Sequence, residues 1–402
     1  MPENPGDAAT QDPGPDSSAV PLNSIRIADF TRILAGPLCT MLLGDLGANV
    51  VKVERPGEGD DTRHWGPPFV GEDAAYFLSL NRNKRSIALD LATPDGQAAA
   101  FALARSADVV VENFRPGLME RFGLGWERVH EENPSAVYCS LTAFGDLEEG
   151  ARPGYDIIVQ AVSGLMSITG ERDGPPVKVG VALLDVVTGL YAANGIQASL
   201  RAREATGEGQ RLTVSLFESS VASLVNQAAN YLMGGAVPGP MGTEHPNIVP
   251  YQVFAGADRP FVLAAGNDRL FERTCQAIGR PELADDPRFE TNGERVRNRK
   301  ELVSLLSEVF ATRPANEWVD ALTARSVPCS PVRSIDEVFA SSEGAAIVQT
   351  VDDPARGTLH LTADPIRLSG ELAPVRRPPP RLGQHTDEVL AELGLFPAST
   401  EP

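Results

Sequence analysis

The alternation of strand-like and helix-like segments between residues 25 and 142 most constrains how this chain can fold. Residues 25–30 and 49–54 have strand patterns, and residues 36–46 between them have a helical pattern with Pro37 in its first turn. A strand, a helix and a strand within ~30 residues form a βαβ unit, in which the strands pair in parallel. Strand patterns recur at residues 86–91, 108–111 and 136–142, and a helical pattern recurs at 94–106. The sequence therefore predicts an α/β protein built on an open parallel sheet.

The first turn of this βαβ unit bears on the choice of cofactor. A Rossmann-like sheet that binds a dinucleotide carries G-x-G-x-x-G at this turn, whereas residues 31–37 read TRILAGP. Without those glycines the backbone cannot approach a pyrophosphate closely, so NAD is not the favoured cofactor. Glu54 stands where an acid would hold a ribose, but Arg55 follows it directly. This order suggests that side chains hold a phosphate or an adenine.

Length and local composition predict the domain organisation. A chain of 402 residues is long enough for roughly two to three domains. We predict a disordered tail at residues 1–22, a Rossmann-like large domain at 23–220, a linker at 221–250, a small α+β domain at 251–337 and a C-terminal segment at 338–402. A long helix is predicted at 218–233, where the large domain meets the linker. The C-terminal segment carries a proline-rich run at 375–382, which is typical of a chain that wraps a surface.

Net charge and cysteine usage exclude several classes of function. The net charge is −19, and a nucleic-acid-binding protein needs a basic surface, so we expect no nucleic acid partner. Apolar runs fall short of the ~18–20 residues that span a membrane, so no membrane segment is expected. The four cysteines and five histidines have no metal-site spacing, and no metal is expected. Without a recognisable signal peptide we interpret the cysteines as reduced thiols of a cytoplasmic protein.

Two carboxylates, Asp156 and Asp185, stand beside apolar runs and are the candidate reagents. Asp185 precedes a helical pattern at residues 186–200, and an aspartate in that place is a favoured N-cap worth ~1 kcal/mol. A helix N-terminus would also lower the pKa of the carboxyl and fix its direction, so capping and catalysis are compatible. Asp156 is either a buried acid satisfied by backbone N–H groups or a group that steers a substrate.

Cations gather near the ends of successive βα units, although the chain as a whole is acidic. They are Arg55, Lys84, Arg85, Arg115 and Arg121. Such residues are commonly a solvated surface, but in open α/β sheets ligands lie at the carboxyl ends of the strands. Arginine forks there would bind phosphates, and Phe114 is either a core residue or a platform for an adenine.

An ordered set of motifs, spread over residues 25–393, resembles the class III coenzyme A transferases of the CaiB/BaiF type. The motifs are DFTRILAGP at 29–37, DLGANVVKVE at 45–54, GDDTR at 59–63, NRNKRS at 81–86, ENFRPG at 112–117, RPGYD at 152–156, PC at 328–329 and LGQHT at 382–386. The resemblance implies a Rossmann-like large domain, a linker, a small domain and a C-terminal segment that returns to the large domain. It also implies an interlocked homodimer in which each chain threads through the other.

The resemblance assigns roles to individual residues. Asp185 takes the place of the family's nucleophile, and Asp156 takes the place of a companion acid. The positions that contact CoA fall on Arg55, Asn113, Phe114 and Arg121, with Asn81, Lys84 and Arg85 close in the same pattern. CoA is then a substrate, and no tightly bound cofactor is implied.

The implied reaction moves CoA from an acyl-CoA to a free carboxylic acid, with succinyl-CoA or another dicarboxyl-CoA as the expected donor. Two further hypotheses stay open, an α-methylacyl-CoA racemase of the same superfamily and a non-catalytic CoA-binding protein. The racemases carry a histidine where this chain has Tyr155, and a tyrosine with a pKa near ~10 is a poor base at neutral pH. Members that act on oxalate carry a glutamine where this chain has Leu34, so exchange with oxalate is not expected.

Overall fold

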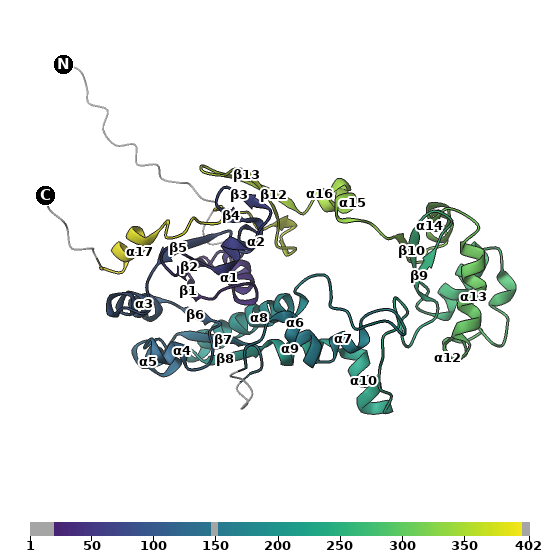
Figure 1. Ribbon diagram of the computed structural model, residues 1–402, viewed down its shortest axis with the longest axis horizontal. Helices are drawn as coiled ribbons and strands as arrows, with labels where there is room; N and C mark the ends of the chain where they lie inside the picture. Colours follow the sequence, from purple (N-terminus) through teal and green to yellow (C-terminus); the bar gives the residue numbers. More distant parts are fainter. Residues whose placement is uncertain (1–19, 146–151, 396–402) are drawn as a thin grey trace, which may run out of the picture. The chain divides into compact units, whose positions relative to one another are not determined.

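A six-stranded parallel sheet forms the centre of the large unit in this computed structural model, which describes residues 20–145 and 152–395 (Figure 1). Its strands are β1 (Arg26–Phe30), β2 (Asn49–Glu54), β5 (Lys84–Ala88), β6 (Val109–Glu112), β7 (Val137–Thr142) and β8 (Arg211–Ser215). Their order across the sheet is β5-β2-β1-β6-β7-β8, and each neighbouring pair is parallel. This is the Rossmann order: from β1 the next two strands extend the sheet on one side, and the last three extend it on the other side. The predicted fold class is confirmed.

Helices cover both faces of the sheet, which explains why all of its strands except the edge strand β8 are buried almost throughout. One face packs on α3 (Pro94–Ser106) and α5 (Trp126–Glu132), through side chains such as Ala28 and Val110. The other face packs on α1 (Ala35–Asp45) and α8 (Leu183–Thr206), through side chains such as Ile27 and Val109 (Figure 1). Alternate residues of one strand therefore face opposite cores.

The reversal of strand order lies between β1 and β6, which are adjacent strands. The turn Thr31–Ile33 follows β1, and Asn113 follows β6. Because the strands are parallel, both turns leave the same edge of the sheet. Such a switch point leaves a crevice at the carboxyl ends of the strands, where ligands of open α/β sheets bind.

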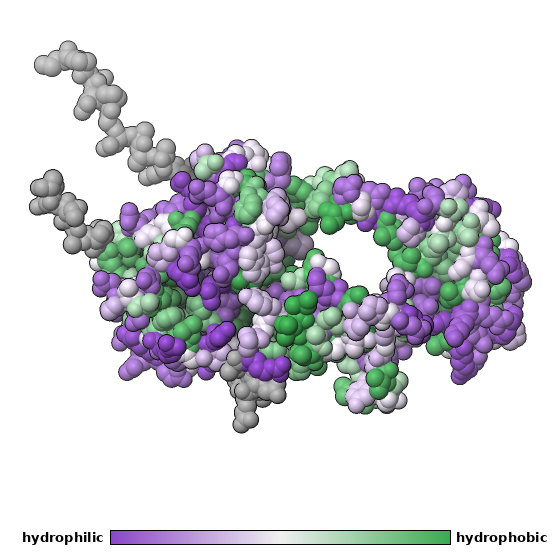
Figure 2. All heavy atoms as spheres, viewed as in Figure 1, coloured by the Kyte–Doolittle hydropathy of each residue, from purple (hydrophilic) through white to green (hydrophobic). Residues whose placement is uncertain are grey.

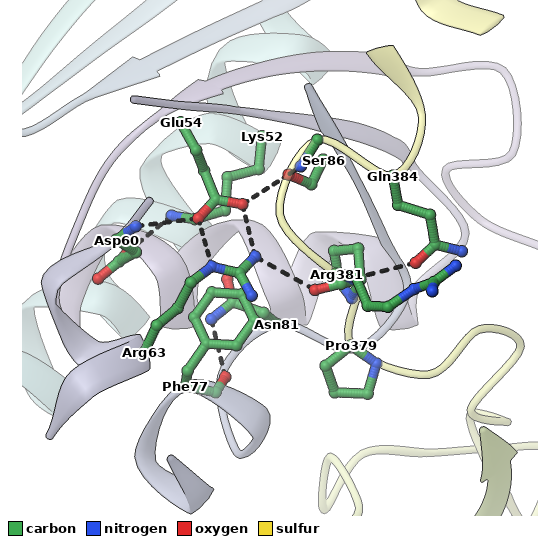
Figure 3. A network of polar contacts seen from close by, with 12 residues as sticks. Lys52, Glu54, Asp60, Arg63, Phe77, Asn81, Ser86, Pro379, Arg381 and Gln384 are labelled. Carbon is green, nitrogen blue, oxygen red and sulfur yellow. Dashed lines mark hydrogen bonds and ion pairs between the residues drawn. The ribbon is translucent and has the colours of Figure 1, made fainter. Parts of the chain in front are cut away.

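A buried ionic network fills the connection between β2 and β5 (Figure 3). This connection contains η2 (Asp61–His64), β3 (Phe69–Val70), β4 (Asp73–Ala74) and α2 (Ala75–Leu78). The Arg63 guanidinium donates hydrogen bonds of 2.8 and 2.7 Å to Glu54, and one of 2.7 Å to Asp73. It also donates to the Pro380 carbonyl at 3.2 Å, and it lies over the Phe77 ring. Arg63 thus ties the first βαβ unit to the C-terminal segment.

The C-terminal segment returns to the large unit, as the resemblance implied. It contains β12 (Val348–Asp353), β13 (Gly357–Thr362), β14 (Arg367–Leu368), β15 (Glu371–Leu372) and α17 (Thr386–Glu392). Glu388 and Glu392 of α17 form ion pairs with Arg85 on β5. The His385 backbone N–H donates to the Ser86 carbonyl at 2.9 Å, so this segment borders the edge strand.

The described residues form two compact units whose boundaries differ in detail from those predicted. The large unit comprises residues up to 163, residues 180–224 and residues from 347 onward, and the second unit comprises 164–179 and 225–346. Residues 164–179, placed by sequence in the large domain, therefore group with the second unit. Of the predicted tail at 1–22, residues 1–19 lie outside the described residues, and Leu22 packs against the core beneath α1.

The second unit is α+β and has its own core. Its elements are α7 (Leu165–Ile168), α10 (Val225–Gly234), β9 (Tyr251–Ala255), β10 (Pro260–Ala264), α11 (Asp268–Ala277), η4 (Pro281–Leu283), α12 (Asn292–Arg297), α13 (Arg299–Phe310), α14 (Ala315–Thr323), β11 (Cys329–Pro331), α15 (Ile335–Ala340) and α16 (Ser342–Ala345). The prediction of a single helix at 218–233 is wrong, because two helices, α9 (Leu216–Ser223) and α10, occupy this stretch. α9 ends before α10 begins, because Val225, the first residue of α10, has a positive φ of 41° that interrupts a continuous helix. Among the described helices, none is both long enough and apolar enough to cross a membrane.

We expect Arg63→Met to lower the free energy of unfolding by about 3–5 kcal/mol, because it leaves the buried carboxylates of Glu54 and Asp73 without their shared partner. Denaturant unfolding of the two proteins measures the difference. Arg201→Met is the matched control, since Arg201 pairs with Glu204 on an exposed surface, where ion pairs contribute little. Equal losses in the two variants would contradict a structural role for the network.

Candidate active site

Asp185 lies in the first turn of α8, but it is not the cap of this helix. The helix begins at Leu183, its N-cap residue is Ala182, and no side chain of that residue bonds the helix. Asp185 is therefore the third helical residue, and the predicted N-cap role is wrong. The reason is that the helix starts earlier than the predicted pattern at residues 186–200.

Asp156 instead accepts a hydrogen bond from a backbone N–H group at the start of α8. It is the first residue of α6 (Asp156–Val162), and its side chain is buried. Its Oδ1 accepts a 2.8 Å hydrogen bond from the Leu184 backbone N–H, and its Oδ2 accepts one from Gln160. The carboxylate thus caps a helix that lies 28 residues further along the chain. This contact holds the first turn of α8, and with it Asp185, against α6.

The environment raises the pKa of Asp185 to about 7, whereas the helix-terminus argument predicted a lowered value. Burial makes the larger contribution, and the negative charge of Asp156 adds to it. A carboxyl with a pKa near neutrality, in a pocket, has the character of a functional group rather than that of a surface acid.

Asp185 lines a pocket of about 740 Å³ at the switch point of the sheet. The turn after β1 contributes Arg32 through Ala35, and the turn after β6 contributes Asn113 and Phe114. Further lining residues include Asp61, Arg115, Leu118, Arg121, Leu141, Arg152, Tyr155 and Leu216. A carboxyl and several guanidinium groups therefore face one space, which suits an anionic substrate that reacts with a carboxylate.

A smaller pocket of about 340 Å³ shares Arg32, Phe114 and Leu118 with the first. Arg55 lines this second space, and its side chain is exposed and pairs with Glu58. Apolar side chains cover much of the wall, among them Val53, Leu89, Leu91 and Phe122. Of the predicted ligand-binding residues, Arg55, Asn113, Phe114 and Arg121 thus surround two adjoining pockets.

The structure does not bring Asn81, Lys84 and Arg85 to these pockets. The Lys84 ammonium is fully buried, where it donates to Asp29 at 3.1 Å and to Asn81 at 3.0 Å. Burial lowers the pKa of Lys84 to about 8, although Asp29 opposes this shift. The Asn81 amide also donates to the Phe77 carbonyl, and Arg85 is taken up by the carboxylates of α17. These three residues hold the scaffold around the site.

Three residues near the site were not singled out from the sequence. Arg32 and Arg152 line the larger pocket, and the Arg32 guanidinium lies 4.9 Å from the centroid of the Phe114 ring. The pKa of Tyr76 is raised by burial and then by the charges of Asp185 and Asp156, so its phenol lies near both acids. The sequence does indicate Arg32 as a site residue, because it follows β1 at the switch point.

Within residues 20–145 and 152–395, no cluster of His, Cys, Asp or Glu is placed to hold a metal ion.

Comparisons with known proteins agree with this architecture. The family model described as CoA-transferase family III matches residues 22–386. Succinyl-CoA:glutarate CoA-transferase from Mus musculus is 45% identical over 94% of this chain and 87% of its own length. Succinate--glutarate CoA-transferase from Agrobacterium fabrum is 43% identical over 95% of this chain and 98% of its own. A crystal structure of a CAIB/BAIF family protein from Brucella suis has a TM-score of 0.82 at 41% identity, covering 93% of this chain and all of that one.

A buried carboxyl with a raised pKa lines a pocket that several guanidinium groups also line, at the switch point of a Rossmann-like sheet. The match over nearly the whole chain then gives the family: the chain belongs to CoA-transferase family III. It is an enzyme of the transferase class (EC 2.8.3) whose substrates are CoA thioesters. The family predicted from the motifs is confirmed.

We expect Asp185→Asn to raise the melting temperature, and to raise it more at about pH 8 than at about pH 5. The fold raises the pKa of Asp185 from 3.8 to about 7, so the stability that is fully present below pH 3.8 is lost progressively as the pH rises from 3.8 through 7. Asparagine carries no charge and avoids that loss, which is on the order of 4 kcal/mol for a shift of about three pKa units at about 1.4 kcal/mol per unit. Thermal unfolding across this pH range measures the difference.

Asp95→Asn is the matched control, because Asp95 is an exposed aspartate in the first turn of α3. There the charge favours the helix, so the substitution lowers the melting temperature slightly at about pH 8. A gain from Asp185→Asn that does not vary with pH would show that the carboxyl is not held in a perturbed state.

Proposed function

We propose that this enzyme transfers CoA from succinyl-CoA, or another dicarboxylic acyl-CoA, to a free carboxylic acid, and that Asp185 is the nucleophile. The observation that carries the proposal is the position of Asp185 on the wall of a pocket lined by guanidinium groups at the switch point. The relatives named for succinyl-CoA and glutarate support the choice of donor. Tyr155, in the place of the racemases' histidine, favours transfer over racemisation.

Each step of the proposed cycle exchanges one acyl bond for another. A carboxylate oxygen of Asp185 attacks the thioester carbonyl of the donor, forming a mixed anhydride and releasing the CoA thiolate. The thiolate attacks the Asp185 carbonyl, giving an aspartyl-CoA thioester and releasing the donor acid. The acceptor carboxylate attacks that thioester and forms a second anhydride, again releasing the thiolate. Attack of the thiolate on the acceptor carbonyl yields the new acyl-CoA and restores the Asp185 carboxylate.

The environment of Asp185 suits this cycle. Its pKa of about 7 makes the carboxylate available near neutral pH while burial keeps its oxygens poorly solvated, which favours attack on a carbonyl. Asp156 serves as a positioning residue, because its bond to the Leu184 N–H fixes the turn that carries Asp185. No proton is consumed in any step, so neither acid acts as a proton donor.

For CoA we propose direct contacts with Arg55, Phe114 and Arg121, which line the two adjoining pockets. Arginine forks suit the 3′-phosphate and the diphosphate, and the aromatic ring offers a face to the adenine. We propose that Asn81, Lys84 and Arg85 support these contacts through the scaffold, since their polar groups bond other parts of the protein. CoA enters and leaves as a substrate in this cycle.

We also propose an interlocked homodimer in the cytoplasm. α10 buries none of its residues, and Leu232 and Met233 are 77% and 87% exposed. Val237 beyond it is 81% exposed, and apolar surface is visible over this helix (Figure 2). A second copy of the chain would cover such side chains, in keeping with the threaded dimers of the family. All four cysteines are free thiols, which fits a reducing compartment.

Activity with a panel of acyl-CoA donors and carboxylic acid acceptors tests the proposed function. We expect exchange between succinyl-CoA and dicarboxylic acids, and we expect Asp185→Asn to lower kcat at least about 10³-fold, as loss of a covalent nucleophile does. Hydroxylamine added during turnover should convert Asp185 to a hydroxamate that peptide mass spectrometry detects.

Asp95→Asn is again the control: it should keep full activity and, like the wild-type enzyme, acquire the hydroxamate on Asp185, whereas Asp185→Asn should acquire none. Exchange that survives Asp185→Asn would sink the covalent mechanism. Loss of the acyl α-proton to solvent without CoA transfer would instead favour the racemase.

A further inference from the structure

The turn Thr31–Ile33 forms one wall of the pocket and has a strained backbone. It joins β1 to α1, and Ile33 has a φ of 72°. This left-handed conformation suits glycine, whereas a β-branched side chain meets its own backbone there. A residue held in such a conformation persists only where its surroundings impose it, and such residues gather at functional sites.

Asn113, directly after the neighbouring strand β6, forms two hydrogen bonds with the middle residue of this turn. Its Oδ1 accepts a 2.8 Å hydrogen bond from the Arg32 backbone N–H, and its Nδ2 donates a 2.7 Å hydrogen bond to the Arg32 carbonyl. The side-chain amide thus pairs with both polar groups of one residue, as a β-strand neighbour would. This contact joins the two turns that border the switch-point crevice.

A buried ion pair forms hydrogen bonds with the turn on either side of Arg32. The Lys52 ammonium donates to the Thr31 carbonyl at 2.7 Å and to Asp60 Oδ2 at 2.8 Å, and both side chains are fully buried. Asp60 Oδ1 accepts a 3.3 Å hydrogen bond from the Ile33 N–H. Figure 3 shows Lys52 and Asp60 directed toward one another beside Glu54. Asp29 completes the set by accepting the Thr31 N–H at 2.9 Å.

Close backbone packing connects this turn to the helix that carries the nucleophile. A Cβ at Gly36 would lie 2.3 Å from the Thr31 side chain, so the turn and the first turn of α1 are in contact. A Cβ at Gly189 would lie 2.7 Å from the Ala35 carbonyl, so α8 touches α1 at its start. Asp185 precedes Gly189 by one helical turn on the same face of α8. Successive packing contacts therefore link the turn, α1 and the first turns of α8, which carry Asp185.

We propose that Asn113 and the buried pair Lys52–Asp60 are positioning residues that hold the strained turn Thr31–Ile33 against the reacting acyl group opposite Asp185. The proposal rests on the proposed function, because it concerns the same pocket. It assigns Asn113 a role other than direct CoA contact. A turn displaced by a fraction of an ångström spoils the approach of the nucleophile while leaving phosphate and adenine contacts in place.

Two substitutions separate positioning from CoA contact. In Asn113→Ala, we expect kcat to fall about 10- to 100-fold, since misplacement near 1 Å costs up to about 10²-fold. The Kd for free CoA, measured by titration calorimetry, stays within about threefold. Arg121→Ala is the matched comparison, because it should raise the Kd for CoA and change kcat less. Thermal unfolding verifies that both variants are folded.

A rescue experiment tests whether backbone conformation is the link. Glycine adopts a positive φ without a steric cost, whereas alanine retains the Cβ that causes it. In the Asn113→Ala background we therefore expect Ile33→Gly to restore kcat about fivefold relative to Ile33→Ala. Both changes remove the side-chain atoms of Ile33 beyond Cβ, so the difference between them reports the effect of the Cβ on the backbone conformation.

An activity-independent measurement keeps this proposal separate from the proposed function. Hydrogen exchange of the Arg32 amide should quicken at least about tenfold in Asn113→Ala, because that amide loses its acceptor. If no donor and acceptor pair shows CoA transfer with the wild-type enzyme, the proposed function fails. Hydrogen exchange at residues 31–33 still tests whether Asn113 holds the turn. Three results would overturn the positioning role of Asn113. They are unchanged hydrogen exchange, a rise in the Kd for CoA that accounts for the whole loss of activity in Asn113→Ala, and equal kcat for Ile33→Gly and Ile33→Ala in that background.

Discussion

The hydrogen bond from the Leu184 N–H to the Asp156 carboxylate is the contact on which the rest of the site depends. It satisfies an N–H group at the start of α8, a helix whose own N-cap residue has no side chain able to accept one. It also brings a second negative charge close to Asp185. One contact therefore orients the proposed nucleophile and contributes to raising its pKa to about 7. The folded state bears this electrostatic cost, as expected for a site arranged for reaction rather than for stability.

The sheet explains why this carboxyl meets cationic side chains. Strand order reverses between β1 and β6, so the turns after these strands border one crevice. Arg32 comes from the first turn, and Asn113 and Phe114 come from the second. α8 packs against the start of α1, which brings Asp185 to the same crevice from the other side. An acidic chain thus forms a pocket that is locally rich in arginine.

Local patterns predicted the framework of the fold well. The bounds of β2 and α3 match the predicted strand at 49–54 and helix at 94–106, because apolar periodicity and flanking residues determine both. The break at Val225 was missed, because the helical pattern continues through it and only the backbone of the folded chain reveals it. The family was also recognisable from the motifs alone.

Roles that depend on distant partners were harder to predict. The cap of α8 was assigned to Asp185, whereas the accepting carboxylate belongs to Asp156, 28 residues before the N–H that it bonds. Lys84 appeared as a candidate ligand for phosphate, but its partner Asp29 lies 55 residues away in sequence and on another strand. Strand register and helix packing decide such pairings, and no local window of sequence contains them.

If Asp185 is the nucleophile, it exchanges an oxygen atom with the acids in every turnover. In the proposed cycle, the acceptor carboxylate supplies the bridging oxygen of the second anhydride, and that oxygen stays on Asp185 when the acceptor leaves as its CoA ester. Turnover with succinyl-CoA and an acceptor labelled with ¹⁸O should therefore increase the mass of the peptide that contains Asp185, and later place the label in the released succinate. A peptide that remains unlabelled while CoA transfer proceeds would contradict covalent catalysis by this residue.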